Sequence, residues 1–250
     1  MCEDDRVSID HPDELAALRA VGRVVSETLR ELARRVRPGV STRELDDVAA
    51  QIFADHGARS GPRLDYDFPG VICISIDDEC VHGIPSGRKL REGQLVKLDV
   101  TAELDGFYAD ACRTVPVGRV RPREQRLVAA AQSALRRGLD AATAGNNVGA
   151  IGGAVQAEVE RRGFSVCAEL SGHGIGRRIH EEPDVPNVAW DGPELTPGLV
   201  ITVEPIIAAG LGDVHVADDG WTIRTDDGSP SAHAEHTIVI TDAAPLLVTA

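Results

Sequence analysis

The sequence predicts an α+β fold, in which helices cover the outer face of one antiparallel sheet arranged about a pseudo-two-fold axis. Helical hydrophobic periodicity precedes short β-branched runs, and this order occurs twice along the 250 residues. No Pro/Gly/Ser-rich linker separates the two occurrences. We therefore expect a single domain over residues 1–250, with half-repeats at about residues 12–115 and 120–242.

Two helices are expected at the start of the first half-repeat. Apolar residues recur every three or four positions over residues 15–36, which is typical of an amphipathic helix, and Pro38 ends this pattern. Ser41 and Glu44 have the spacing of a capping box. A second helix is therefore expected to begin there and to close at Gly57.

Strands are expected after these helices, and the second half-repeat has the same order. Residues 71–76 and 95–101 are short β-branched runs bounded by glycine and proline, which favours strands. Pro122 and Asn147 begin two further helical patterns, and the second of these ends at Gly163. One spacing recurs in both halves and ends in an acid: Leu90, Gly93 and Asp99, then Leu195, Gly198 and Glu204.

The composition excludes several classes of protein. Lys and Arg number 26 against 40 Asp and Glu, and the net charge of -14 disfavours binding to nucleic acid or to anionic membranes. No apolar run approaches the roughly 20 residues that cross a bilayer. The N-terminus is acidic where a secretory signal is basic and then apolar, so a cytoplasmic location is expected. The five cysteines are scattered without a C-x-x-C pair, which favours reduced, mostly buried thiols.

Two aspartates are expected on one face of a hairpin, because an Asp-Gly pair lies between the β-prone runs that contain Asp99 and Asp110. A turn centred on Leu104-Asp105 would place Asp99 opposite Asp110. A turn centred on Asp105-Gly106 would instead place Thr101 opposite Asp110. Either register leaves both carboxylates on the same face, where they repel each other unless a cation or a proton lies between them.

Other residues of metal-ligand type lie at the ends of predicted strands or among glycines. His173 stands in a glycine-rich loop, where the backbone can approach another group closely. Glu204 ends a strand expected to be buried, and Glu235 enters another; a buried carboxylate needs a cationic partner. With the two aspartates, these residues offer four carboxylates and one imidazole. That set suits two divalent ions of Co, Mn, Fe or Zn and predicts hydrolysis by an activated water.

Two further histidines, His82 and His180, are candidates for hydrogen bonding to a substrate amide, although spacing alone favours a structural role for both. Only a structural role is expected for the remaining histidines: His11, His56, His215, His233 and His236.

Several segments together resemble the motifs of type I methionine aminopeptidases, and the likeness spans nearly the whole chain. They are Val81-His82-Gly83-Ile84-Pro85, Lys97-Leu98-Asp99-Val100-Thr101 with the gap to Asp110, Ser171-Gly172-His173-Gly174-Ile175-Gly176 with His180-Glu181-Glu182-Pro183, Thr202-Val203-Glu204-Pro205 and Glu235-His236-Thr237-Ile238-Val239. The resemblance implies the pita-bread fold. It also implies a monomeric enzyme that removes the initiator methionine from nascent polypeptide N-termini, at the ribosome, where the second residue is small.

The resemblance also implies roles for individual residues. By motif match, the ligands of two metal ions would be Asp99, Asp110, His173, Glu204 and Glu235. Glu204 would in addition transfer the proton of the attacking water, His82 would contact the scissile amide, and His180 would polarise the scissile carbonyl. The pocket for the methionine side chain would include Phe68, Cys73, Ile179 and Trp221.

The chain departs from the family pattern at the pocket. Leu64-Asp65-Tyr66-Asp67-Phe68-Pro69 replaces a Tyr/His/Gly/aromatic run, and Ile179 stands where a phenylalanine is common. Two alternative functions are a Pro-directed peptidase of the same fold and a non-catalytic relative that binds a partner. The first is expected to carry a longer N-terminal domain, and the second is expected to have lost metal ligands.

Overall fold

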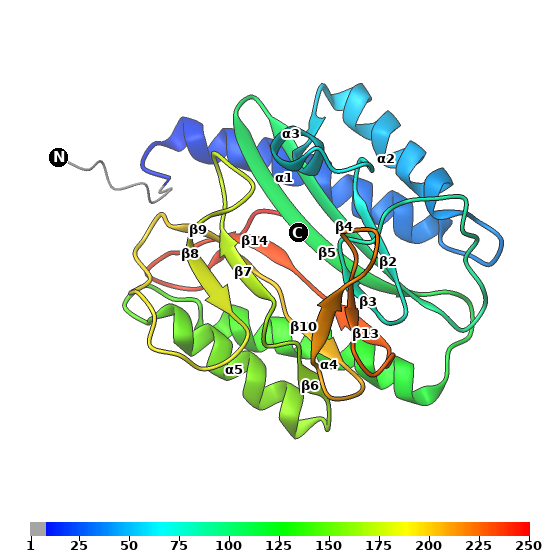
Figure 1. The fold of residues 1–250 in the computed structure, drawn as a ribbon. Helices are drawn as coiled ribbons and strands as arrows, with labels where there is room; N and C mark the ends of the chain where they lie inside the picture. The colour runs from blue at the N-terminus through cyan, green and yellow to red at the C-terminus, as the bar shows by residue number, and fades with distance from the viewer. Residues whose placement is uncertain (1–8) are drawn as a thin grey trace.

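The structure, a computed structural model, describes residues 9–250 and confirms the α+β class (Figure 1). The helices are α1 (Pro12–Arg35), α2 (Thr42–His56), α3 (Gly61–Tyr66), α4 (Pro122–Ala141) and α5 (Val148–Arg161). The strands are β1 (Arg59–Ser60), β2 (Cys73–Ile76), β3 (Glu79–Val81), β4 (Leu95–Leu104), β5 (Phe107–Pro116), β6 (Ser165–Val166), β7 (Ser171–Gly174), β8 (Glu181–Pro186), β9 (Val200–Val203), β10 (Ile206–Ala208), β11 (Val214–Val216), β12 (Ile223–Thr225), β13 (Ser231–His233), β14 (His236–Val239) and β15 (Leu246–Leu247).

The ends of the long helices follow the predicted capping residues. Ser41 Oγ accepts a hydrogen bond from the Glu44 backbone N–H, and the Glu44 carboxylate accepts one from the Ser41 N–H, so the capping box of α2 is present. Gly57 closes α2 in the left-handed conformation with φ 69°. Asn147 caps α5 through its side chain. Helix α3 was not predicted from the sequence.

The antiparallel strands are divided among four sheets and do not join into the single sheet expected from the sequence. The long hairpin β4–β5 belongs to one sheet, and β7, β8, β9, β14 and β15 form another. Between these two sheets, the Thr237 hydroxyl accepts a hydrogen bond from the Asp110 N–H and donates one to the Asp110 carbonyl. Arg113 of β5 and Ala234, which precedes β14, form an isolated antiparallel bridge at the same junction, so the two sheets are joined by a short contact and not by a continuous ladder.

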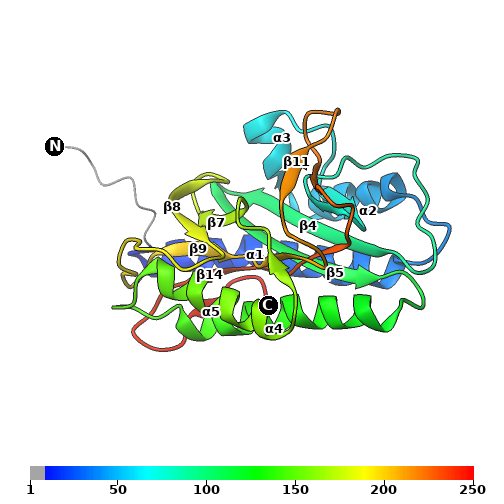
Figure 2. The same cartoon turned by 60° about the horizontal axis from the view of Figure 1, so that its bottom comes forward.

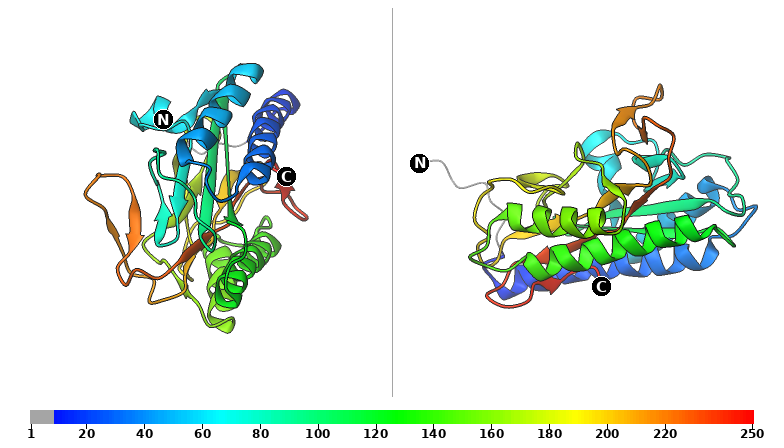
Figure 3. Two further views of the ribbon diagram at one scale, coloured as in Figure 1. Left: turned by 90° about the vertical axis from the view of Figure 1, so that its right-hand side faces the viewer. Right: turned by 90° about the horizontal axis from the view of Figure 1, so that it is seen from below.

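Two hydrophobic cores hold the helices against the strands. Helix α1 packs on β4 and β5, whereas α4 and α5 pack together over β9 and neighbouring strands. Figures 2 and 3 show these three helices on one side of the strands and the β11–β12 hairpin on the opposite side. Because side chains alternate along β4, Leu98 and Val100 face α1 while Asp99 and Thr101 project to the opposite face.

The predictions about membrane-spanning segments and about the cysteines agree with the described residues. Among residues 9–250, no helix is both long and apolar enough to cross a membrane. Cys73, Cys80, Cys112 and Cys167 are buried free thiols, as predicted. Cys2 lies outside the described residues.

Candidate active site

The β4–β5 hairpin resolves the register that the sequence left open. Asp105 and Gly106 form the turn, with φ 52° and 84°, and Thr101 pairs with Asp110. The Thr101 hydroxyl donates a hydrogen bond of 2.7 Å to Asp110 Oδ2. Asp99 pairs with Cys112. Asp99 lies two residues before Thr101 on β4, so its side chain is on the same face of the hairpin. Both aspartates line one cavity, as either register predicted.

His173 is held between two neighbouring strands that approach it closely. A Cβ atom on Gly174 would lie 2.2 Å from the Glu182 carbonyl oxygen, so only glycine fits there. The His173 ring Nδ1 is 2.9 Å from the Gly174 carbonyl oxygen. Because that oxygen only accepts hydrogen bonds, Nδ1 carries the hydrogen, and the lone pair of the neutral ring is on Nε2. Nε2 lies 3.5 Å from Glu204 Oε1.

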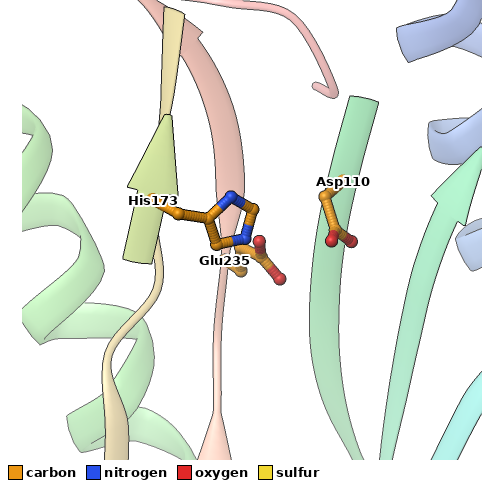
Figure 4. Close-up of side chains that lie close together, drawn as sticks. All are labelled: Asp110, His173 and Glu235. Atoms are coloured by element: carbon orange, nitrogen blue, oxygen red, sulfur yellow. The ribbon is translucent and has the colours of Figure 1, made fainter. Parts of the chain in front are cut away.

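The two glutamates reach the same place from different strands. Glu204 follows β9, and its Oε1 accepts a hydrogen bond of 2.8 Å from the Thr202 hydroxyl. Glu235 precedes β14 and is brought beside β5 by a hydrogen bond from its N–H to the Cys112 carbonyl. Figure 4 shows His173, Glu235 and Asp110 directed toward one another. One potential ligand atom from each of these three lies within 4.8 Å of those of the other two.

The electrostatics of this cluster suit a cation. Burial raises the pKa of Asp110 to about 6. Burial, with the neighbouring carboxylates, raises the pKa values of Asp99, Glu204 and Glu235 well above their ordinary range. Asp110 Oδ1 and Glu235 Oε1 are buried without a hydrogen-bond partner in the described chain. Buried carboxylate oxygens without hydrogen-bond partners, beside an imidazole nitrogen, are a set of ligand atoms that suits divalent transition metals.

One cavity of about 320 Å³ brings together all eleven residues that the sequence singled out for the site. Its polar end is lined by His82, Asp99, Asp110, His173, His180, Glu204 and Glu235. Its apolar part includes Phe68, Cys73, Ile179 and Trp221. The Phe68 and Trp221 rings meet edge to face with centroids 5.3 Å apart, which stabilises that wall.

The two remaining candidate histidines enter the cavity from different segments. His82 follows β3 with φ 57°, a conformation unusual for a residue with a side chain. Burial lowers the pKa of His82 to about 4. The His180 ring packs edge-on against His173, with centroids 4.1 Å apart. Burial lowers the pKa of His180 as well. Both imidazoles are therefore neutral near pH 7 and able to donate one hydrogen bond each.

Sequence reasoning did not assign several residues of this cavity to the site, and His233 and Tyr66 are two of them. The His233 side chain is 2% exposed, and its Nε2 lies 3.5 Å from Glu235 Oε2 and 3.8 Å from Glu204 Oε2. Its position two residues before Glu235 was an available signal, because residues i and i+2 of extended chain share a face. Tyr66 lies in the segment that departs from the family pattern at the pocket, but its place in the cavity was not predicted, since it belongs to the unpredicted helix α3.

Comparison with known proteins identifies the class. Residues 16–242 match the model of metallopeptidase family M24, so the chain belongs to that family and is a metal-dependent hydrolase. Methionine aminopeptidase 1 of Bacillus subtilis is 39% identical over 233 residues, covering 92% of this chain and 94% of that protein. Methionine aminopeptidase of Clostridium perfringens is 37% identical over 97% of this chain and 98% of its own length. The resemblance predicted from the motifs is thereby confirmed.

Solved structures confirm the pita-bread fold. The crystal structure of methionine aminopeptidase from Rickettsia prowazekii has a TM-score of 0.94 at 37% identity, and the match covers 98% of this chain and 100% of that one. Prolidase from Pyrococcus furiosus has a TM-score of 0.79 at 20% identity, covering 98% of this chain and 66% of that one. At that identity, the likeness to prolidase concerns the fold alone.

The stability of the metal-free protein is expected to fall between pH 5 and pH 8. A carboxyl whose pKa is raised by folding stabilises the folded state below its unfolded pKa, and this contribution is lost as the pH rises through the folded pKa. The Asp110 pKa moves from 3.8 to about 6, so its contribution, about 3 kcal/mol at about 1.4 kcal/mol per pKa unit, is lost between about pH 4 and pH 7. The raised pKa values of Asp99, Glu204 and Glu235 extend the loss to higher pH. Thermal unfolding of chelator-treated protein at several pH values measures this loss.

Asp110→Asn provides the matched variant for that measurement, because it removes the titrating group and keeps the shape. Its metal-free form should lose less stability over the same pH range. Mn²⁺ added to the wild type at pH 8 should restore the unfolding temperature and release protons. A metal-free wild type whose unfolding temperature is flat or rises from pH 5 to pH 8 would contradict the prediction.

Proposed function

We propose that this enzyme removes the initiator methionine from nascent proteins and peptides whose second residue is small. The observation that carries the proposal is the single cavity in which a cation-binding cluster adjoins an apolar wall of Phe68, Ile179 and Trp221. A cleft of about 320 Å³ suits one amino-acid side chain and a short stretch of backbone. The relatives that match over nearly the whole chain are methionine aminopeptidases, which supports the same activity.

We further propose that two divalent ions, drawn from Co, Mn, Fe and Zn, occupy the polar end. Their ligands would be Asp99, Asp110, His173, Glu204 and Glu235. Four carboxylates balance the charge of two such ions, and the unpartnered oxygens of Asp110 and Glu235 support ligation there. When bound, the ions would lower the pKa of a water molecule and polarise the substrate carbonyl.

The chain's own residues would divide the remaining work of the reaction. Glu204, held by the Thr202 hydroxyl, would take a proton from the attacking water and return it to the leaving amine. His180 would donate a hydrogen bond to the carbonyl oxygen as negative charge develops there. His82 would hydrogen-bond to the scissile amide. Phe68, Cys73, Ile179 and Trp221 would hold the methionine side chain, with the substrate's α-amine at the metal end.

The wider setting is also a proposal. Residues 1–250 would form a single catalytic domain with half-repeats at about residues 12–115 and 120–242. Four buried free thiols favour a reducing compartment and so a cytoplasmic enzyme. It would act as a monomer on nascent chains at the ribosome, without binding nucleic acid or membrane, in agreement with the net charge of -14.

The test is release of free methionine from Met-Ala-Ser by metal-reconstituted protein, with Leu-Ala-Ser, an Ala-Pro dipeptide and a chelator-treated sample in parallel. We expect metal-dependent cleavage of the methionine peptide alone. Cleavage of Ala-Pro instead would favour a Pro-directed peptidase. No cleavage of any peptide by protein with bound metal would overturn the proposed activity.

A further inference from the structure

Helix α3 contacts the segment that carries His180, at the place where the sequence departs from the family pattern. Tyr66 is the last residue of α3, and its hydroxyl lies 2.6 Å from His180 Nδ1. The two rings are tilted by 53°, with centroids 5.5 Å apart. Asp67 caps the end of the helix, and its left-handed φ of 55° turns the chain away immediately after Tyr66. These two side chains are 114 positions apart in sequence, so the contact belongs to the tertiary fold.

The residue before Tyr66 contacts the residue before His180. Asp65 Oδ2 accepts a hydrogen bond of 3.2 Å from the Ile179 N–H. The other oxygen, Oδ1, accepts one of 2.9 Å from the Tyr108 hydroxyl, which anchors Asp65 to β5. Asp65 therefore holds the backbone of a residue in the apolar wall, while Tyr66 holds the ring of a histidine in the polar end.

The direction of the Tyr66 hydrogen bond decides whether the other ring nitrogen of His180, Nε2, donates or accepts a hydrogen bond. A neutral imidazole carries one hydrogen, on either Nδ1 or Nε2. If the Tyr66 hydroxyl donates to Nδ1, the hydrogen is on Nε2, and Nε2 can donate a hydrogen bond. If Nδ1 donates to Tyr66 instead, Nε2 can only accept, and it cannot stabilise a carbonyl oxygen.

We propose that Tyr66 is a positioning residue, whose hydroxyl donates to His180 Nδ1 and so keeps the hydrogen on Nε2 for the substrate carbonyl. The neighbouring Asp65 has a different role: its hydrogen bond from the Ile179 N–H holds the apolar wall in place. The inference rests on the proposed function of His180 and adds the residues that orient it. It also gives the departure at Asp65 and Tyr66 a role in catalysis and substrate binding.

The two neighbours are expected to have different kinetic signatures on Met-Ala-Ser. Tyr66→Phe should lower kcat about tenfold with KM within about twofold, because a hydrogen bond needed in the transition state is weakened. Asp65→Ala should raise KM about fivefold, with kcat within about twofold, because the wall that holds the side chain is loosened. Metal content and unfolding temperature confirm that both variants are folded. If both substitutions change the same parameter, α3 acts only as a structural support and the proposal is wrong.

A spectroscopic measurement tests the direction of the hydrogen bond independently of turnover. In zinc-loaded, full-length protein labelled with ¹⁵N-histidine, the His180 signals are assigned by their loss in His180→Gln. We expect a protonated Nε2 and an unprotonated, hydrogen-bonded Nδ1 in the wild type. The signature of the Nδ1 hydrogen bond should disappear in Tyr66→Phe and persist in Tyr108→Phe, which removes the other tyrosine hydroxyl near Asp65. A protonated Nδ1 in the wild type would overturn the proposal.

The two measurements separate this proposal from the proposed function. If the wild type releases no methionine but His180 has the expected tautomer, the aminopeptidase assignment fails and the Tyr66 hydrogen bond stands. If methionine is released and the tautomer is reversed, the activity stands and the role of Tyr66 is wrong.

Discussion

Asp110→Ala is expected to lower the rate of methionine release by roughly three orders of magnitude or more, and to lose bound metal. Asp110 Oδ1 is buried and has no hydrogen-bond partner within residues 9–250, so it is free to bind a metal ion, and the substitution removes this ligand atom. Methionine release and metal content measured on the same sample check the prediction.

Asp140→Ala is the matched control, because Asp140 is a solvent-exposed aspartate on α4 whose ion-pair distance to Arg137 is 3.7 Å. An exposed pair contributes little to stability, so this variant should keep both activity and metal. If Asp110→Ala retained wild-type activity at normal metal content, the proposed ligand set would be wrong.

His180→Ala is expected to lower kcat by about a hundredfold or more while metal content remains unchanged. The basis is the cost of removing one hydrogen-bond donor to developing negative charge, which is commonly of this size. His180 lies against His173 in the cavity, yet its Nδ1 is already engaged by Tyr66. Steady-state kinetics and metal analysis of the purified variant provide the measurement.

His56→Ala controls for the loss of an imidazole away from the cavity, since His56 is exposed and pairs with Glu27 at 3.2 Å. It should leave both kcat and metal content unchanged. A loss of metal in His180→Ala would show that His180 is a ligand, which would contradict the role proposed for it.

The sequence predicted the helices well because their signals are local. Ser41 with Glu44 and Asn147 each specify a helix start through hydrogen bonds that span only three residues. Helix α3 has six residues and contains Gly61 and Pro62, so it is too short for hydrophobic periodicity to develop. The division into four sheets was also beyond local patterns, because it depends on pairing between strands that are far apart in sequence.

The site was predictable to a similar degree and for related reasons. The hairpin placed Asp99 and Asp110 on one face in either register, but only the observed pairing of Thr101 with Asp110 selected one. The motif resemblance supplied the remaining residues, and all of them line the cavity. His233 was passed over because a histidine alone more often has a structural role, and its proximity to Glu204 depends on how separate strands come together.

The bonds between Thr237 and Asp110 also bear on biosynthesis. The proposed ligands extend from Asp99 to Glu235, and the hydroxyl that joins their two sheets comes still later in the chain. A ribosome makes the chain from the N-terminus, so the early aspartates emerge long before any partner for them exists. Each molecule therefore lacks a complete ligand set until Glu235 has been synthesised, and it cannot process its own N-terminus before that point.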